Sequence, residues 1–347
     1  MSRSPRSDHF DPLEVSVFHC RNRCVRQSYL LGDDPLTGKN YDHRKQWIED
    51  RIEFLAGQYA IDVIGFSVMS NHFHVVLRNR PDIVATWTDQ EVARRWLMLC
   101  PIRKQADGTP ETPTQSEIDA LVKDTKKLQE VRIRLSHISW FMRMLDEHIS
   151  RRANAEDGKT GHFWEGRFRG TKLVEVVAIL ACLMYVDLNP IRAGMARTPE
   201  ESQHTSAQRR AQRRIDQHHG KPAQAADWLA PMTLDETAPP GPMPSQLTCR
   251  CSDKGFLPLS LDQYLKLLDW TGRQAASGKH GKIPEHLAPI LVRLGIDADA
   301  WMTVTTRFGE LFYRIAGRRE TLAREADRKG RRWYQAPGSR LFTSTVA

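Results

Sequence analysis

Two histidines separated by one residue, His72 and His74, are the sharpest candidates for chemistry in this sequence. They begin the run 72–78, which is rich in valine and other apolar residues and is predicted to be a strand. Residues i and i+2 of a strand point to the same face, so the two imidazoles would lie side by side while Phe73 points into the core. Two imidazoles at that separation can hold one divalent metal ion. The alternative is a pair of surface histidines beside a turn.

Tyr185 and Asn189 form a second candidate pair, spaced i and i+4 at the end of the strongly apolar run 174–188. This run is predicted to be a helix, in which that spacing places the phenol and the amide on one face, one turn apart. An amide oxygen can be a third metal ligand, and a phenol beside it can attack a phosphate held by the same metal. The alternative is a core tyrosine with a polar tip, followed by an asparagine that ends the helix before Pro190.

A third candidate is the segment 161–172, in which aromatic residues alternate with arginines. Rings stack on bases and guanidinium groups meet phosphates, so this composition suits a single-stranded nucleic acid. An exposed strand edge with cross-strand aromatic and arginine packing explains the pattern equally well. On charge grounds, and for the tryptophan on stacking grounds, the candidate DNA contacts in the whole chain are Arg21, Arg23, Arg152, Trp164, Arg167, Arg169 and Lys172.

The elements that would position these side chains alternate between strand and helix patterns. Residues 61–69 and 72–78 are predicted to form a hairpin with the two-residue link Ser70-Asn71. Apolar residues at three- and four-residue spacing predict helices at 41–56 and 128–153. The other expected elements are a strand at 13–20, a strand at 163–173, and short C-terminal helices at 259–269, 286–294 and 308–316.

The composition favours a polyanionic partner and excludes several classes of protein. The 347 residues include 51 Lys and Arg against 42 Asp and Glu, a formal net charge of +9, which suits nucleic acid. The longest apolar stretch, 173–186, is too short to cross a bilayer and contains Glu175. The N-terminus has no apolar segment of a secretion signal. Six cysteines are too few for a disulfide scaffold, so a reduced, cytoplasmic setting is expected.

The chain is expected to divide into three parts. Residues 1–196 carry all three candidate motifs, with an insertion at about 80–127. Seven of the nineteen prolines lie between residues 199 and 244, which predicts a Pro-rich linker or poorly ordered segment over 197–257. Residues 258–347 are expected to form a smaller, basic, mainly helical region.

Taken in order, three motifs resemble those of the single-tyrosine HUH transposases, and most closely their REP-associated branch. The motifs are residues 69–77 (MSNHFHVVL), 164–168 (WEGRF) and 185–194 (YVDLNPIRAG). The resemblance covers residues 13–196. The insertion, the Pro-rich segment and the C-terminal region are additions to the minimal family pattern, and their open roles are DNA reading, dimer formation or neither.

The resemblance implies an α+β fold, with a ferredoxin-like antiparallel sheet that carries the histidine pair. By the same resemblance His72, His74 and Asn189 would bind Mg²⁺ or Mn²⁺, and Tyr185 would attack a DNA strand to give a 5′-phosphotyrosine. The implied activity is cleavage and rejoining of single-stranded, hairpin or REP-type DNA by a monomer or homodimer at the nucleoid. The alternative is a settled, sequence-specific DNA-binding protein of the same fold that no longer transposes.

Overall fold

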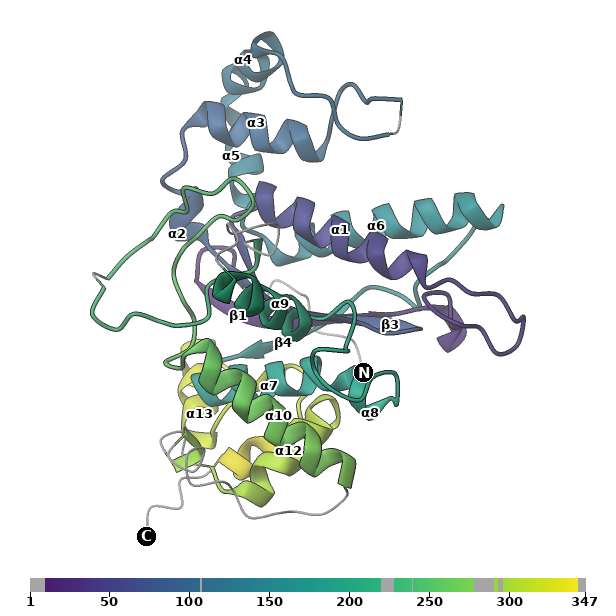
Figure 1. The fold of residues 1–347 in the computed structure, drawn as a ribbon. Helices are drawn as coiled ribbons and strands as arrows, with labels where there is room; N and C mark the ends of the chain where they lie inside the picture. Colours follow the sequence, from purple (N-terminus) through teal and green to yellow (C-terminus); the bar gives the residue numbers. More distant parts are fainter. Residues whose placement is uncertain are drawn as a thin grey trace.

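The computed structural model describes residues 10–106, 108–219, 228–238, 240–277, 290–292 and 296–342. Five strands form one sheet, with helices on both faces (Figure 1). The strands are β1 (Ser16–Arg23), β2 (Ile61–Val68), β3 (His72–Asn79), β4 (Arg169–Leu173) and β5 (Ile315–Ala316). The helices of the N-terminal half are η2 (Val25–Gln27), α1 (His43–Gln58), α2 (Pro81–Val84), α3 (Asp89–Leu99), α4 (Gln115–Lys123), α5 (Thr125–Arg134) and α6 (Ile138–Asp157). Those that follow β4 are α7 (Val176–Asp187), α8 (Asn189–Arg192), α9 (Ser206–His218), α10 (Leu261–Ser277), α12 (Ala298–Leu311), α13 (Arg319–Arg328) and η4 (Pro337–Phe342).

The sheet is mixed, with the strand order β2-β3-β1-β4-β5. Pairing is antiparallel between β2 and β3, β3 and β1, and β1 and β4, whereas β5 pairs parallel to β4. The expected wholly antiparallel sheet is therefore corrected at one edge, because the C-terminal region contributes a short strand that the sequence pattern did not reveal. The fold class is α+β. No helix within the described ranges has both the length and the apolar character needed to span a membrane.

The hairpin of β2 and β3 carries the histidine pair. Its strands end within one residue of the predicted bounds, and Met69 N donates to His72 O across the turn at 2.8 Å. Every residue of β2 and all but His72 in β3 are buried, because helices cover both faces of the sheet. This burial explains why the sequences of both strands are nearly continuous apolar runs, without alternation of apolar and polar residues.

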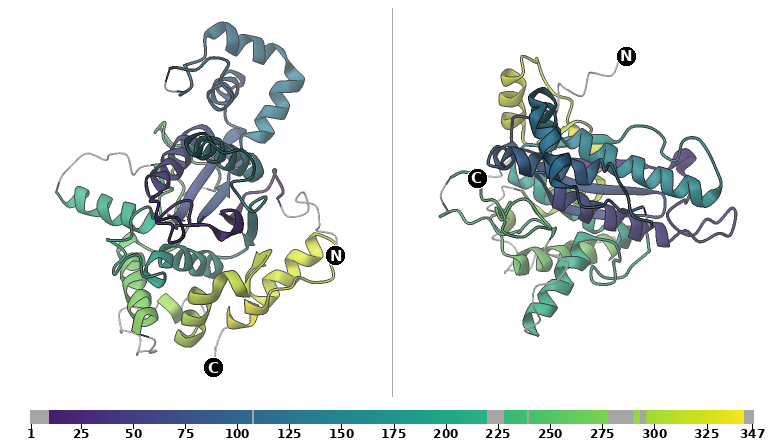
Figure 2. Two further views of the ribbon diagram at one scale, coloured as in Figure 1. Left: turned by 90° about the vertical axis from the view of Figure 1, so that its right-hand side faces the viewer. Right: turned by 90° about the horizontal axis from the view of Figure 1, so that it is seen from above.

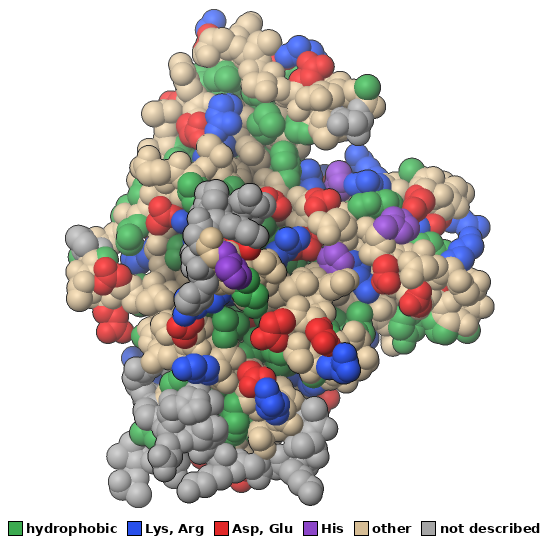
Figure 3. All heavy atoms as spheres, viewed as in Figure 1, with side chains coloured by type: hydrophobic (Ala, Val, Ile, Leu, Met, Phe, Trp, Pro, Cys, Tyr) green, Lys and Arg blue, Asp and Glu red, His purple; other side chains and the backbone are tan. Residues whose placement is uncertain are grey.

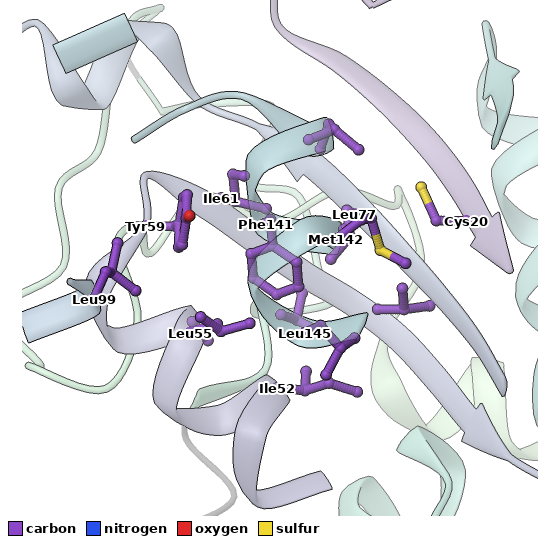
Figure 4. Close-up of a cluster of buried hydrophobic side chains, with 14 of the residues drawn as sticks. Cys20, Ile52, Leu55, Tyr59, Ile61, Leu77, Leu99, Phe141, Met142 and Leu145 are labelled. Atoms are coloured by element: carbon purple, nitrogen blue, oxygen red, sulfur yellow. The ribbon is translucent and has the colours of Figure 1, made fainter. Parts of the chain in front are cut away.

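The two faces of the sheet pack against two separate cores. On one face α1 and α6 lie side by side, and their apolar stripes meet Cys20, Ile61 and Leu77 of the strands (Figure 4). On the other face lies α7, of which ten residues are buried. Helices α10 and α12 of the C-terminal region pack around α7, as the rotated views show (Figure 2).

Several predicted elements differ from the structure in their bounds or type, among them the strand expected at 13–20, which is β1, and the helix expected at 259–269, which continues to Ser277 as α10. The single helix expected at 128–153 is two helices, α5 and α6, because the helix is interrupted at residues 135–137. The side chain of His137 caps the start of α6 by accepting a hydrogen bond from Ser139 N. The strand expected at 163–173 is confined to β4. The helix expected at 308–316 ends at Leu311, and Ile315 and Ala316 pair with β4 instead. Most of the helix expected at 286–294 lies outside the described residues.

The insertion forms a lobe of helices α2 to α5 that projects beyond α1 (Figures 1 and 2). The described residues of the segment expected to be a Pro-rich linker include helix α9 and fold back onto the sheet. Ala230 N donates to Val63 O at 2.9 Å, and Arg78 donates to the backbone oxygens of Lys254 and Gly255. These are sheet contacts that a free linker would not make.

Candidate active site

A hollow of about 220 Å³ opens beside β1 and β3 on the α7 side of the sheet. It brings together residues from three of the candidate motifs. The lining residues are Arg21, Asn22, Arg23, His72, His74, Glu165, Gly166, Arg167, Arg169 and Tyr185. The sheet register explains the grouping, since Arg21 is paired with His74 on one side and with Arg169 on the other, and Arg23 is paired with His72. Directly paired residues of antiparallel strands share a face.

His72 and His74 lie side by side, with their ring centroids 5.0 Å apart and their planes nearly perpendicular. Phe73, between them in the sequence, points to the opposite core and packs edge-on against Trp164. This is the arrangement that strand alternation predicts. His74 is buried, whereas His72 is half-buried at the mouth of the hollow.

In both imidazoles Nδ1 is engaged in a contact and Nε2 is left without a partner among the described residues. Nδ1 of His72 lies 2.6 Å from Oδ1 of Asn71, and since a carbonyl oxygen only accepts, Nδ1 carries the proton. Nε2 of His72 is then the nitrogen with a free lone pair. Nδ1 of His74 lies 2.8 Å from Nε2 of His19, a buried histidine on β1. Nε2 of His74 is buried and has no hydrogen-bond partner among the described residues.

All three imidazoles are held neutral. Burial lowers the pKa of His19 to about 3 and that of His72 to about 4, because the charged form loses its hydration. Burial also lowers the pKa of His74 well below its ordinary value, and repulsion from His72 and His19 adds to the effect. A neutral imidazole keeps a nitrogen lone pair that can bind a metal ion at physiological pH.

Tyr185, in the last turn of α7, stands beside the histidines. Its ring centroid is 5.5 Å from that of His74 and 6.1 Å from that of His19. On its other side it meets α12, where Phe308 lies 6.0 Å away between ring centroids. Gly309 comes so close that a Cβ built on it would be 3.0 Å from the Tyr185 hydroxyl. The C-terminal region thus forms one wall around the tyrosine.

Arg192 fixes Tyr185 from α8. Its guanidinium carbon lies 4.6 Å from the centroid of the Tyr185 ring, a cation–π contact. The same guanidinium donates to the Tyr185 backbone oxygen at 2.5 Å and to Thr305 O in α12 at 2.7 Å. Arg192 therefore satisfies a backbone oxygen in the last turn of α7 and links that helix end to the C-terminal region.

Asn189 is not brought into the hollow. Helix α7 ends at Asp187, and Asn189 begins the separate short helix α8, so the single continuous helix assumed from the i, i+4 spacing is interrupted. The residue is half-buried, and its Nδ2 is buried without a hydrogen-bond partner among the described residues. It does not line the hollow in this structure.

The candidate DNA contacts divide into two groups. Arg21, Arg23, Arg167 and Arg169 line the hollow, where Glu165 is the one acidic residue among the described lining. The other three candidates have structural partners elsewhere. Trp164 is buried and donates a hydrogen bond to Asp146 O. Lys172 is buried and forms ion pairs with Glu14 and Glu325. Arg152 stacks on Trp47 on the opposite face of the sheet.

Four residues of the site were missed by sequence reasoning: His19, Arg192, Phe308 and Gly309. His19 and Arg21 have the i, i+2 spacing of one strand face, and this signal was present in the predicted strand 13–20 and its basic extension. Arg192 lay inside the YVDLNPIRAG motif without a role. Phe308 and Gly309 carried no signal, because only tertiary packing brings α12 to the tyrosine.

The donor atoms present fit a divalent metal through two imidazoles. Nε2 of His72 and of His74 are the free nitrogens, and the second is buried without a partner among the described residues, which is costly unless a ligand satisfies it. Across the part of the chain that the structure describes, no three or more His, Cys, Asp and Glu side chains are grouped to hold a metal. Further ligands would therefore be the Asn189 amide, water or a bound phosphate.

Comparison with known proteins gives little further guidance. No family model matches the sequence, and no curated protein matches it. The chain is similar to a solved structure of a REP-associated tyrosine transposase bound to a REP hairpin, with a TM-score of 0.32 and 12% identity over 62% of this chain and 88% of that chain. Similarity at this level carries no functional argument, so the function has to be inferred from the geometry of the hollow.

Proposed function

We propose that this protein is a metal-dependent endonuclease and strand transferase, of the transposase type, that cleaves and rejoins single-stranded DNA through Tyr185. The observation that carries the proposal is the meeting of Tyr185, His72 and His74 in one arginine-lined hollow, although they come from separate elements. A phenol beside two neutral imidazoles and several guanidinium groups has the parts that phosphoryl transfer to a tyrosine requires.

Each residue has a distinct role in the proposed reaction. Tyr185 Oη attacks the scissile phosphorus, an O–P bond to the tyrosine forms, and the bond to the 3′ oxygen breaks. The phenol proton leaves to solvent, the departing 3′ oxygen takes up a proton from solvent to become a 3′-hydroxyl, and the protein keeps the 5′-phosphate. Attack by another 3′-hydroxyl reverses the step and joins two strands, so no nucleotide cofactor is consumed.

A Mg²⁺ or Mn²⁺ ion held by His72 and His74, with Asn189 as a further ligand after a local shift, would polarise the scissile phosphate and offset its negative charge. Arg21 and Arg169 lie in one row across the sheet with His74, and they face the position that the phosphate would take. Arg192 and Phe308 hold the tyrosine ring on two sides, so its hydroxyl is positioned before the strand arrives.

The order of elements supports the same proposal. From β1 to β4 the chain runs β1-α1-β2-β3-α6-β4, apart from the inserted lobe, and the four strands lie in the order β2-β3-β1-β4 with antiparallel pairing. This order supports the split βαβ arrangement of ferredoxin-like domains that the proposal assumes. In the proposed enzyme the central strands β1 and β3 present the site to α7.

One observation favours a second candidate function, a DNA-binding protein that no longer cleaves. Asn189 does not line the hollow, and Gly309 and Phe308 lie against Tyr185, so in this arrangement the nucleophile is hemmed in and one expected ligand is displaced. A protein of that kind would bind single-stranded or hairpin DNA through the arginines of the hollow and leave it intact.

Covalent trapping separates the two functions. The full chain is incubated with a labelled pool of single-stranded hairpin DNA and Mn²⁺ or Mg²⁺, and a denaturing gel detects DNA that stays bound. We expect an adduct that disappears with Tyr185→Phe, with His72→Ala/His74→Ala, and with a chelator, while DNA binding by Tyr185→Phe persists. Tight hairpin binding with no adduct across metals and sequences would support the second function.

A further inference from the structure

A second concave surface lies on the opposite face of the sheet from the hollow and shares no residue with it. It is a groove of about 1180 Å³ between α1 and α6 on one side and the end of α3 with residues 101–104 and 108–110 on the other. The inserted lobe therefore supplies one wall. In Figure 3 hydrophobic side chains and Lys and Arg side chains meet in the notch between this lobe and the body of the protein.

Four aromatic rings line the groove. Trp47 and Phe54 come from α1, Trp140 from α6 and Trp96 from α3. Trp47, Phe54 and Trp140 are only partly buried and rest on the hydrophobic core beneath them, which holds them in place. Because the rings are already held in place, little further ordering is needed when a ligand packs against them and the groups that lie over them.

Arginines lie over these rings. Arg152 lies 4.0 Å from the Trp47 centroid, Arg134 lies 4.1 Å from that of Trp140, and Arg51 lies 4.8 Å from that of Phe54. Planar guanidinium groups that stack on aromatic faces can still donate from their edges, and Arg134 does so to Glu130. Each of these three rings in the groove is thus paired with a guanidinium group.

The groove is basic, because six Lys and Arg side chains line it against two carboxylates. The basic residues are Arg51, Lys104, Arg134, Arg143, Arg151 and Arg152, and the acidic ones are Asp50 and Glu147. Glu147 already pairs with Arg143 and Arg151. No described carboxylate pairs with Arg51 or Arg152, and Nε of Arg51 is buried with no partner in the described chain. Burial lowers the pKa of Arg51 to about 10, so it stays charged at neutral pH.

We propose that this groove binds a single-stranded nucleic acid, with bases stacked on the planar ring–guanidinium pairs and phosphates bound by the basic side chains. Stacking on rings and contact with backbone phosphates is how single strands are bound without a fixed sequence. An acidic peptide would use the charges but not the three partly buried rings, and a duplex would present neither free bases nor a narrow backbone. The inference does not depend on cleavage at Tyr185, since the two surfaces are on opposite faces.

The first test is binding of a fluorescent oligo-dT by the full chain in the presence of a chelator, which prevents cleavage. Trp140→Ala is expected to weaken binding about ten-fold or more, within the range for loss of one base–aromatic stack. Trp140→Phe keeps a ring and should restore much of the affinity, which a merely structural loss would not do. Trp333→Ala, at an exposed tryptophan outside the groove, is the matched control and should bind as wild type.

The second test measures how the affinity for oligo-dT depends on salt concentration. Arg152→Ala removes an exposed cation, so the slope of log K against log salt should become shallower by about 0.7, the value for one contact with a single strand. Arg273→Ala, at an exposed arginine on α10 paired with Asp269, should leave the slope unchanged. Unaltered oligo-dT affinity in both Trp140→Ala and Arg152→Ala would overturn the proposal.

The same assay distinguishes this inference from the proposed function. If the groove variants bind as wild type but Arg167→Ala/Arg169→Ala does not, the strand lies only at the hollow and the groove proposal fails. If poly-glutamate displaces the groove ligand better than oligo-dT of equal charge, the groove takes a protein partner and the proposal also fails. Loss of the Tyr185 adduct with intact groove binding would count against the proposed cleavage alone.

Discussion

Nε2 of His19 on β1 lies 2.8 Å from Nδ1 of His74 on β3, with both imidazoles buried. With Nδ1 of His74 in contact with His19, Nε2 of His74 is the nitrogen that has no hydrogen-bond partner among the described residues. In the proposed site His74 binds the metal ion through Nε2 and donates from Nδ1 to His19, which then acts as an outer partner that sets the orientation and the tautomer of His74. His19 is therefore a positioning residue of the site, although it does not line the hollow itself.

Replacement of His19 tests this positioning role. His19→Phe keeps the ring but removes the acceptor, so Mn²⁺ affinity measured by calorimetry should fall about 10- to 100-fold, the usual effect of losing such a partner. His19→Gln, which restores an acceptor oxygen, should recover part of the affinity. His43→Phe, at an exposed histidine paired with Glu156, should bind Mn²⁺ as wild type does. Equal affinity in His19→Phe and wild type would remove His19 from the site.

A substitution at Gly309 tests the contact between α12 and Tyr185, the proposed nucleophile. A Cβ at this position would lie 2.6 Å from Nη1 of Arg21 and 3.0 Å from Oη of Tyr185, so Gly309→Ala must push one or both side chains aside. Because the tip of Arg21 can move, the fold should survive and thermal unfolding should change little. A displacement of the nucleophile by about 1 Å can cost about 100-fold in rate. Adduct formation should therefore fall far more than DNA binding, and wild-type adduct rates would contradict the proposed role of this contact.

Asp187 tests how the end of α7 is anchored. Its buried carboxylate accepts from Ser206 Oγ at 2.6 Å, from Ala207 N at 3.1 Å and from the Tyr264 hydroxyl, which ties α7 to α9 and α10. Asp187→Ala leaves these donors buried without an acceptor, at a cost of roughly 2 to 4 kcal/mol in the free energy of unfolding. Asp187→Asn keeps an acceptor oxygen and should lose less in a urea titration. A loss as large in the asparagine variant as in the alanine variant would show that the hydrogen bonds are not the cause.

The free energy of unfolding should decrease as the pH is lowered through the range in which histidines titrate. The pKa values of His19 and His72 lie at about 3 and about 4 in the folded protein, below the ordinary 6.5 that they regain on unfolding. Above pH 6.5 both states are neutral, so these residues leave the free energy of unfolding flat. As pH falls from 6.5 toward 4, the unfolded chain takes up protons that the folded chain cannot, and stability declines.

Urea unfolding of the metal-free protein from pH 7 to pH 5 measures this dependence. The decline should be smaller in His19→Phe than in wild type, because one of the titrating groups is gone. His43→Phe, which removes an exposed histidine, serves as the comparison. A wild-type stability that stays constant or rises from pH 7 to pH 5 would contradict the burial of the neutral imidazoles.

The hairpin and the side-by-side histidines were predictable because they depend on local information. The strand pattern of residues 61–79 and the period of two place His72 and His74 on one face without reference to the rest of the chain. The apolar run before Asn189 predicts α7 for the same reason. The break at residues 135–137 was not predictable, because the apolar stripe continues through it.

The contacts that complete the site depend on distant segments. The proximity of His19 to His74 needs the β1–β3 register, and the wall formed by Phe308 and Gly309 needs the C-terminal region to pack on α7. Spacing alone placed Asn189 on one helix with Tyr185, whereas α7 ends at Asp187 and Asn189 begins α8 without lining the hollow. Lysine and tryptophan are common in DNA-contacting surfaces, but Lys172 and Trp164 are both buried and contact other residues of this chain.

The proposed enzyme depends above all on a covalent bond between Tyr185 and a DNA 5′-phosphate, and mapping of the trapped adduct would locate that bond. Hairpin DNA is incubated with the full chain and Mn²⁺, the complex is digested with protease and nuclease, and the modified peptide is sequenced by mass spectrometry. We expect a nucleotide attached through its 5′-phosphate to Tyr185, and no modified peptide from Tyr185→Phe. Attachment at another residue, or through a 3′-phosphate, would refute the proposed chemistry.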